Sequence, residues 1–204
     1  RANALFGLGD YEGVLASANR VVELDPDRLE PYPTRAQTFI LLKQWSNALR
    51  DYEHLNQHGK PSHYTFLYEA LLHVKVGDLP GYQSLCQRML EKYLEQPSAK
   101  YAEYLLETCG YAELPPDLLS QLIEIGEEQL TQNPKNANLA RNVGILLIRR
   151  GDVDRAAELF AMARDLGDGS HAIQIWTAIA EQKRGQTSVA QEWFLWIPET
   201  FPSG

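Results

Sequence analysis

The chain has 204 residues, of which 44% are hydrophobic and 23% are charged, a composition typical of a folded domain or a short repeat array and not of a disordered segment. The net charge is −8 and the pI is about 5.1, and an acidic surface repels phosphate backbones, which argues against nucleic-acid binding as the main task. There is no apolar run long enough to span a membrane, and Cys86 and Cys109 provide neither a disulfide framework nor a metal-ligand spacing, so we expect a cytoplasmic protein without metal or cofactor.

Helical periodicity runs through nearly the whole chain and is interrupted at regular intervals by Gly or Pro, whereas the alternation typical of strands is poor. The interruptions recur at one fixed interval, which is the separation between Gly151 and Gly185. Gly9 and Gly77 are separated by twice this interval, and Lys43 stands midway between them. From Gly77 to Gly151 the separation is twice the interval plus six. One repeat therefore carries six additional residues, and we assign them to AELPPD at 112–117.

Two further columns keep the same period. Seven residues before each turn stand Ala2, Ala36, Ala70, Tyr104, Gly144 and Ala178, and five residues after it stand Val14, Ala48, Tyr82, Leu122, Ala156 and Ala190. Small residues are needed where two helices approach closely, and glycine relieves the turn between them. The sequence therefore predicts a chain of antiparallel helix pairs.

This pattern resembles the tetratricopeptide repeat, a helix–turn–helix unit of about 34 residues. The match is strongest in NANLARNVGILLIRRGDVDRAAELFAMARDLGD, where Gly144, Gly151, Ala156, Phe160 and Ala163 fall on positions of the family pattern. The resemblance implies an all-α fold, a right-handed α-solenoid of antiparallel helix pairs. We expect one solenoid domain over 1–204, with a partial unit at 1–28 and units at 29–62, 63–96, 97–136, 137–170 and 171–204. The start within a repeat predicts a fragment of a larger chain.

Three short motifs resemble functional sites. Arg150-Gly151-Asp152 matches the tripeptide read by adhesion receptors, but it occupies the turn that every repeat has, and we expect Asp152 to cap the following helix as Asp10 and Asp78 would. GLGDYEG at 7–13 has the wrong spacing for a phosphate loop. His54 and His58 have a zinc-compatible spacing, but without a companion glutamate or cysteine pair they favour a solvated helix end.

In the tetratricopeptide family, the first helices of successive units line a concave groove. Carried over unit by unit, the resemblance implies a groove with an apolar and aromatic middle, formed by Gln37, Ile40, Tyr64, Leu67, Leu71, Val74, Tyr101, Leu105, Arg141, Ile145 and Ile148. The alternative is that these residues are buried within the chain, and for Leu67 and Leu71 both possibilities stand equal because YTFLYEALLHVKV is apolar all round. With one Arg and no Lys, the groove does not carry the family's clamp for acidic tails.

These residues predict a protein-interaction scaffold that binds a peptide or a neighbouring domain and performs no catalysis. The alternatives are an accessory repeat domain of a multi-domain serine/threonine kinase, whose activity would lie upstream, and a helical-repeat RNA binder. In the last helix, TSVAQEWFLWIPETF, the side chains of Trp193, Trp196 and Phe201 have no place inside the repeat. We therefore expect this end to be covered, by a further helix, by an aromatic tail or by self-association with a second copy.

Overall fold

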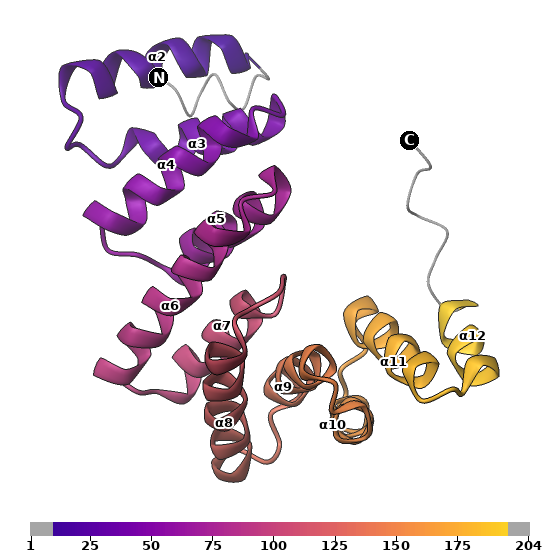
Figure 1. Ribbon diagram of the computed structural model, residues 1–204. Coiled ribbons are helices and arrows are strands. Elements are labelled where there is room, and N and C mark those ends of the chain that lie inside the picture. Colours follow the sequence, from indigo (N-terminus) through magenta and orange to yellow (C-terminus); the bar gives the residue numbers. More distant parts are fainter. Residues whose placement is uncertain (1–9, 196–204) are drawn as a thin grey trace. The chain divides into compact units, whose positions relative to one another are not determined.

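The structure is a computed structural model that describes the backbone of residues 10–195 and the side chains of residues 10–193. This part of the chain contains eleven helices and no strand (Figure 1). They are α2 (Tyr11–Leu24), α3 (Pro31–Leu41), α4 (Trp45–His58), α5 (His63–Val76), α6 (Leu79–Glu95), α7 (Ala99–Cys109), α8 (Pro116–Gln132), α9 (Ala137–Arg150), α10 (Val153–Asp165), α11 (His171–Lys183) and α12 (Thr187–Leu195). The chain divides into a first unit, Arg1–Cys86, and a second unit, Gln87–Gly204, with the boundary inside α6. Among the described residues, no helix is both long and apolar enough to cross a membrane.

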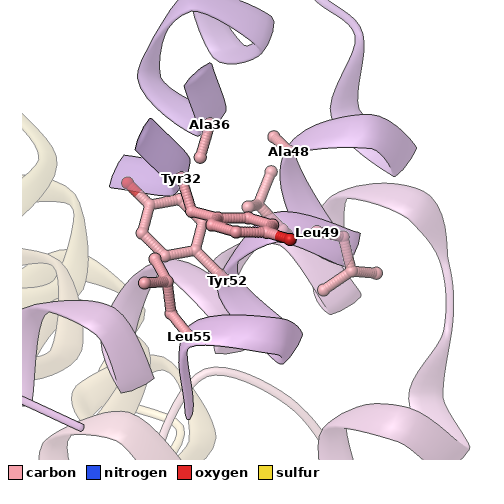
Figure 2. Packing of buried hydrophobic residues seen from close by; sticks show 7 residues of the cluster. Tyr32, Ala36, Ala48, Leu49, Tyr52 and Leu55 are labelled. Atoms are coloured by element: carbon pink, nitrogen blue, oxygen red, sulfur yellow. The ribbon is translucent and has the colours of Figure 1, made fainter. Parts of the chain in front are cut away.

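In the first unit each helix packs on the next, α2 on α3, α3 on α4 and α4 on α5. A hydrophobic cluster joins α3, α4 and α5 (Figure 2) and consists of Tyr32, Ala36, Ala48, Leu49, Tyr52, Leu55 and Leu72. Ala36 and Ala48 are completely buried, one from each helix of the α3–α4 pair. Small side chains at these two positions let the helix backbones approach closely enough for the larger residues to interdigitate.

A buried ion pair adds a polar link to this packing. The guanidinium of Arg35 on α3 donates to both carboxylate oxygens of Asp51 on α4, at 2.8 and 2.5 Å, and its third nitrogen donates to Asn19 on α2 at 3.1 Å. The side chains of Arg35 and Asp51 are 14% and 4% exposed, so water competes little for either partner. One guanidinium therefore joins three consecutive helices.

In the second unit, α9 is the central helix and contacts α7, α8, α10 and α11. Gly144 of α9 lies against Phe160 of α10, and a Cβ atom added to Gly144 would stand 2.5 Å from a carbon of the Phe160 ring. Phe160 is fully buried. The α9–α10 pair therefore depends on the absence of a side chain at the position that the sequence marks as small.

The column five residues after each turn is the clearest outcome of the repeat pattern. Its members are all 0% exposed: Val14, Ala48, Tyr82, Leu122, Ala156 and Ala190. Tyr82 is buried as completely as the alanines, although it departs from the family pattern. The helix-pair fold is thus confirmed, while the boundaries assigned to individual repeats stay a prediction.

The turns between paired helices adopt the left-handed conformation that glycine favours. Gly77, Gly151 and Gly185 have φ angles of 78°, 99° and 79°, and the first two end α5 and α9 directly. At the equivalent position Lys43 has a φ of 57° and is the single non-glycine residue with positive φ among those described. Lys43 therefore adopts the same turn geometry as the glycines. Because it carries a Cβ atom, its backbone is strained in this conformation.

Aspartate caps the start of a helix at two of the three positions where the sequence predicts it. Asp10 accepts the N–H of Gly13 at 2.9 Å, and Asp78 accepts that of Gly81 at 3.0 Å. The expectation for Asp152 is wrong, because its side chain makes no capping hydrogen bond and its carboxylate pairs with the guanidinium of Arg150. The charged neighbour two residues earlier takes the acceptor that would otherwise cap α10.

Candidate functional site

In the first unit, helix α5 exposes large apolar side chains along one face. We call these residues the α5 stripe: Tyr64, Tyr68, Leu71 and Val74, which are 69%, 37%, 38% and 41% exposed. The opposite face carries Phe66, Ala70 and Leu72, all of them buried. The sequence left the orientation of α5 open, because apolar residues surround the helix. Leu71 is exposed, whereas Leu67 is half-buried.

The local sequence determines where α5 begins and how the stripe is held. Ser62 and Thr65 form a capping box, in which the Ser62 hydroxyl accepts the Thr65 N–H at 3.2 Å and the Thr65 hydroxyl accepts the Ser62 N–H at 2.9 Å. The ring of Tyr68 stacks on Tyr52 of α4, with centroids 5.0 Å apart and 15° between the planes. Tyr68 is the member of the stripe that the groove positions did not include, and its i+4 spacing from Tyr64 is the signal that identifies it.

Helix α3 contributes less to an open surface. Of its two predicted residues, Gln37 is exposed and Ile40 is half-buried against the hydrophobic cluster of the first unit. In the first unit, the predicted groove residues that a partner could reach are therefore Tyr64, Leu71, Val74 and Gln37.

In the second unit, α9, α11 and the end of α7 enclose a pocket of about 270 Å³. It contains Arg141 and Ile145 of the predicted set, and its wall also includes Glu107, Gly110, Tyr111, Asn142, Arg149, Ser170, Ala172 and Trp176. The sequence did not predict Trp176 or Tyr111 at this site. Trp176 lies between groove positions of the family pattern, and Tyr111 follows the end of α7. The pocket is large enough for one or two side chains of a ligand.

Both arginines of this pocket are held by other groups. Arg141 donates to Asp168 at 2.6 Å, and the two side chains are 15% and 6% exposed. Burial raises the pKa of Asp168, but hydrogen bonds from Ser170 and Arg141 outweigh it and leave the pKa below its ordinary value. Arg149 donates twice to the carbonyl of Gly110, at 2.9 and 2.6 Å, and its guanidinium lies 5.8 Å from the centre of the Trp176 ring. The pocket therefore presents an ordered rim of cations whose orientation is already determined.

Two of the predicted groove residues belong to the interior. Leu105 and Ile148 are 0% and 6% exposed, so neither offers a surface to a partner. The reason for Ile148 is that α9 has neighbouring helices on several sides, which leaves little of its surface open. Tyr101 is half-buried, its ring lies parallel to that of Tyr93 at 6.4 Å, and burial raises the pKa of its hydroxyl to about 12.

The histidines with zinc-compatible spacing lie in an aromatic stack. The ring of His54 stacks on Tyr32 with centroids 4.3 Å apart, and His58 lies 4.5 Å from His54. Within the described residues, no group of three His, Cys, Asp or Glu side chains could hold a metal ion. Trp193, expected to need cover, is half-buried and has the guanidinium of Arg164 4.7 Å from the centre of its ring, while Trp196 and Phe201 lie outside the described residues.

Comparison with known proteins identifies the fold. No protein-family model matches the sequence, and no curated protein matches it. Several solved structures, however, are similar to this chain. A tetratricopeptide-repeat protein from Parabacteroides merdae ATCC 43184 superposes with a TM-score of 0.62 at 14% identity, over 95% of this chain and 73% of that one. YrrB, described as a TPR protein with an unusual peptide-binding site, gives a TM-score of 0.58 at 17% identity over 84% and 86% of the two chains. MamA gives 0.51 at 12% identity over 95% and 84%. The chain therefore has the all-α solenoid fold of tetratricopeptide-repeat proteins.

Proposed function

We propose that this chain is a protein-interaction scaffold, which binds a peptide or a neighbouring domain through the α5 stripe and performs no catalysis of its own. The observation that carries the proposal is the exposure of Tyr64, Tyr68, Leu71 and Val74 along one helix face. Scattered exposed apolar residues are ordinary, but contiguous apolar surface on one face is typical of an interaction site. The fold supports the same assignment only in general terms, because repeat solenoids host many functions.

The composition of the stripe favours a protein ligand. Tyrosine combines a large apolar area with a polar tip and loses little conformational entropy on binding, so it is common among the residues that dominate binding energy. Tyr64 is 69% exposed, while the hydroxyl-bearing ring of Tyr68 is already oriented by its stack on Tyr52. A preordered aromatic surface lowers the entropic cost of association.

The pocket of the second unit offers a separate contact for a partner. Its half-buried Trp176 and its ordered Arg149 suit a single aromatic or polar side chain better than an extended segment. We assign it a secondary role, because much of its polar wall is already hydrogen-bonded within the chain.

RNA binding is the weaker alternative. Several arginines are paired with carboxylates, as in Arg35–Asp51, Arg141–Asp168 and Arg155–Glu127, and a paired guanidinium contributes less to neutralising phosphates. A gel-shift assay at low salt tests this ranking, and tight binding that weakens steeply with added salt would reverse it.

The experiment that tests the proposal is a peptide-display selection on the full chain, followed by affinity measurements on the enriched peptides. The double variant Tyr64→Ala/Leu71→Ala is expected to weaken binding by about 30-fold, which corresponds to roughly 2 kcal/mol. Leu24→Ala is the matched control, because Leu24 is 68% exposed but lies at the end of α2. If nothing is enriched, or if the enriched peptides bind the double variant as tightly as the wild type, the α5 stripe is not the binding site.

We further propose that the C-terminal end associates with a second copy of this chain. Trp196→Glu is the test. A dimer in sedimentation that this substitution converts to monomer supports self-association, whereas a monomeric wild type contradicts it.

A further inference from the structure

Helix α5 also carries a buried histidine surrounded by three carboxylates. His73 has 2% of its surface exposed. Its Nδ1 atom lies 2.9 Å from a carboxylate oxygen of Asp78, and its Nε2 atom lies 3.6 Å from Glu53 and 3.7 Å from Glu69. These acids come from α4, from α5 itself and from the residue before α6, so the imidazole stands where all three segments meet. Asn56 of α4 adds a neutral contact to this cluster, donating to Glu69 at 2.6 Å.

The start of α6 is packed directly on the His73 ring. A Cβ atom added to Gly81 would stand 2.5 Å from Nδ1 of the imidazole and closer still to Cε1, so the imidazole would have to shift to make room for any other residue. Asp78 accepts the N–H of Gly81 with its other oxygen, and its own N–H donates to the carbonyl of His73 at 2.9 Å. His73 and Asp78 therefore connect the last turn of α5 to the first turn of α6 through side chain and backbone together.

The arrangement distinguishes the two charge states of the imidazole. A neutral ring has one N–H donor and one lone pair, whereas both ring nitrogens of His73 face carboxylate oxygens. A lone pair directed at a carboxylate is repelled, and an imidazolium satisfies both sides. Burial alone would lower the pKa of His73, but the close approach of Glu69, the hydrogen bond to Asp78 and the charges of these two acids outweigh it, so the pKa is raised. The cluster therefore favours the ring with a proton on each nitrogen.

We propose that the α5–α6 turn of the first unit is a proton-dependent latch, closed while protonated His73 bridges Asp78, Glu69 and Glu53 and released when the imidazole becomes neutral. The inference goes beyond the scaffold function and does not depend on it. Because the folded-state pKa exceeds the ordinary value of 6.5, the latch is fully closed below that value and loosens as the pH rises through the folded-state pKa. Val74, the next residue along α5, belongs to the α5 stripe, so the latch and one end of the candidate binding surface share the last turns of the same helix.

Two measurements on the full chain test the latch. In an NMR titration, the His73 resonance, assigned by its loss in His73→Gln, is expected to titrate above pH 6.5, and Asp78→Asn is expected to lower its midpoint. The asparagine keeps an oxygen that can accept the Gly81 N–H, so this variant removes the charge and retains the cap. Asp10→Asn makes the same change at the equivalent cap of α2 and is expected to leave the His73 midpoint unchanged.

In the second measurement, hydrogen exchange detected by mass spectrometry follows the amides of residues 73–82 from about pH 6 to about pH 8.5, corrected for intrinsic exchange. The pKa of His73 is higher in the closed state than in the open state. For each unit of this difference, protection from exchange is expected to fall about tenfold as the pH rises through the titration. Protection is expected to fall over residues 73–82 and to stay constant over the α9–α10 turn. The proposal is overturned if His73 titrates at or below its ordinary value, if protection stays constant, or if His73→Gln retains the pH dependence of the wild type.

Discussion

The contact between Gly144 and Phe160 gives a sharp test of the helix pairing, because Gly144→Ala adds one methyl group to a space that is already filled. The new Cβ atom would lie 2.5, 2.9 and 3.0 Å from three carbons of the Phe160 ring, and this ring is 0% exposed, so it has little room to move. Overpacking of this kind costs about 1–3 kcal/mol. We use the upper end because the overlap is about 1 Å relative to optimal carbon–carbon separation. Alanine regains about 1 kcal/mol over glycine in a helix, so the net loss is about 2 kcal/mol.

Urea unfolding followed by helical circular dichroism measures this loss, with the m-value checked for constancy. Gly169→Ala is the matched control, because nothing lies within 4 Å of its added Cβ atom, and it is expected to unfold as the wild type does. In a Phe160→Leu background, the cost of Gly144→Ala should become smaller, since the clashing ring is gone. A Gly144→Ala variant as stable as the wild type would refute the close approach of α9 and α10.

Four further substitutions test individual contacts in the same unfolding assay. Lys43→Gly should stabilise the chain by about 1 kcal/mol, because glycine relieves the left-handed strain at φ 57°; a loss of stability would contradict this. Asp10→Ala should lower the free energy of unfolding by about 1 kcal/mol, because it removes the cap of α2. Asp152 caps no helix, so Asp152→Ala should change the free energy of unfolding by less than about 0.5 kcal/mol. Equal losses in the two variants would contradict this distinction. Arg35→Leu should cost about 3–5 kcal/mol by leaving the buried carboxylate of Asp51 without its cation, and a loss below about 1 kcal/mol would show that the pair is dispensable.

The periodic features of the fold could be predicted from the sequence because they repeat. Gly77 and Gly151 share a column, and both adopt the same left-handed geometry. Lys43 occupies this column without being a glycine and still keeps the geometry. The position within the repeat thus determines a backbone conformation that the residue type alone would have argued against.

The capping of α10 could not be predicted in the same way. The column placed Asp152 with Asp10 and Asp78, but Arg150 stands where those two repeats have Leu8 and Val76. Its guanidinium withdraws the Asp152 carboxylate from the backbone. Capping depends on which donor competes best for one acceptor, and a neighbour two residues away changes that competition.

The candidate site was predicted only in part, because exposure depends on neighbouring helices as well as on the position within a repeat. Leu71 and Leu105 occupy the same position of successive repeats, yet one is 38% exposed and the other is fully buried. The cluster around His73 went unnoticed because its acids come from three segments. The one local sign was the i, i+4 spacing of Glu69 and His73, which is common on helices.

The most direct test of the scaffold proposal is to locate a bound peptide on the full chain by NMR. With a display-selected peptide added to saturation, we expect the amide and side-chain shift changes to concentrate on residues 63–76 and to include the rings of Tyr64 and Tyr68. The same titration of Tyr64→Ala/Leu71→Ala should show these changes only at much higher peptide concentration. Shift changes confined to the second unit, or spread evenly over both units, would contradict the assignment of the α5 stripe as the binding surface.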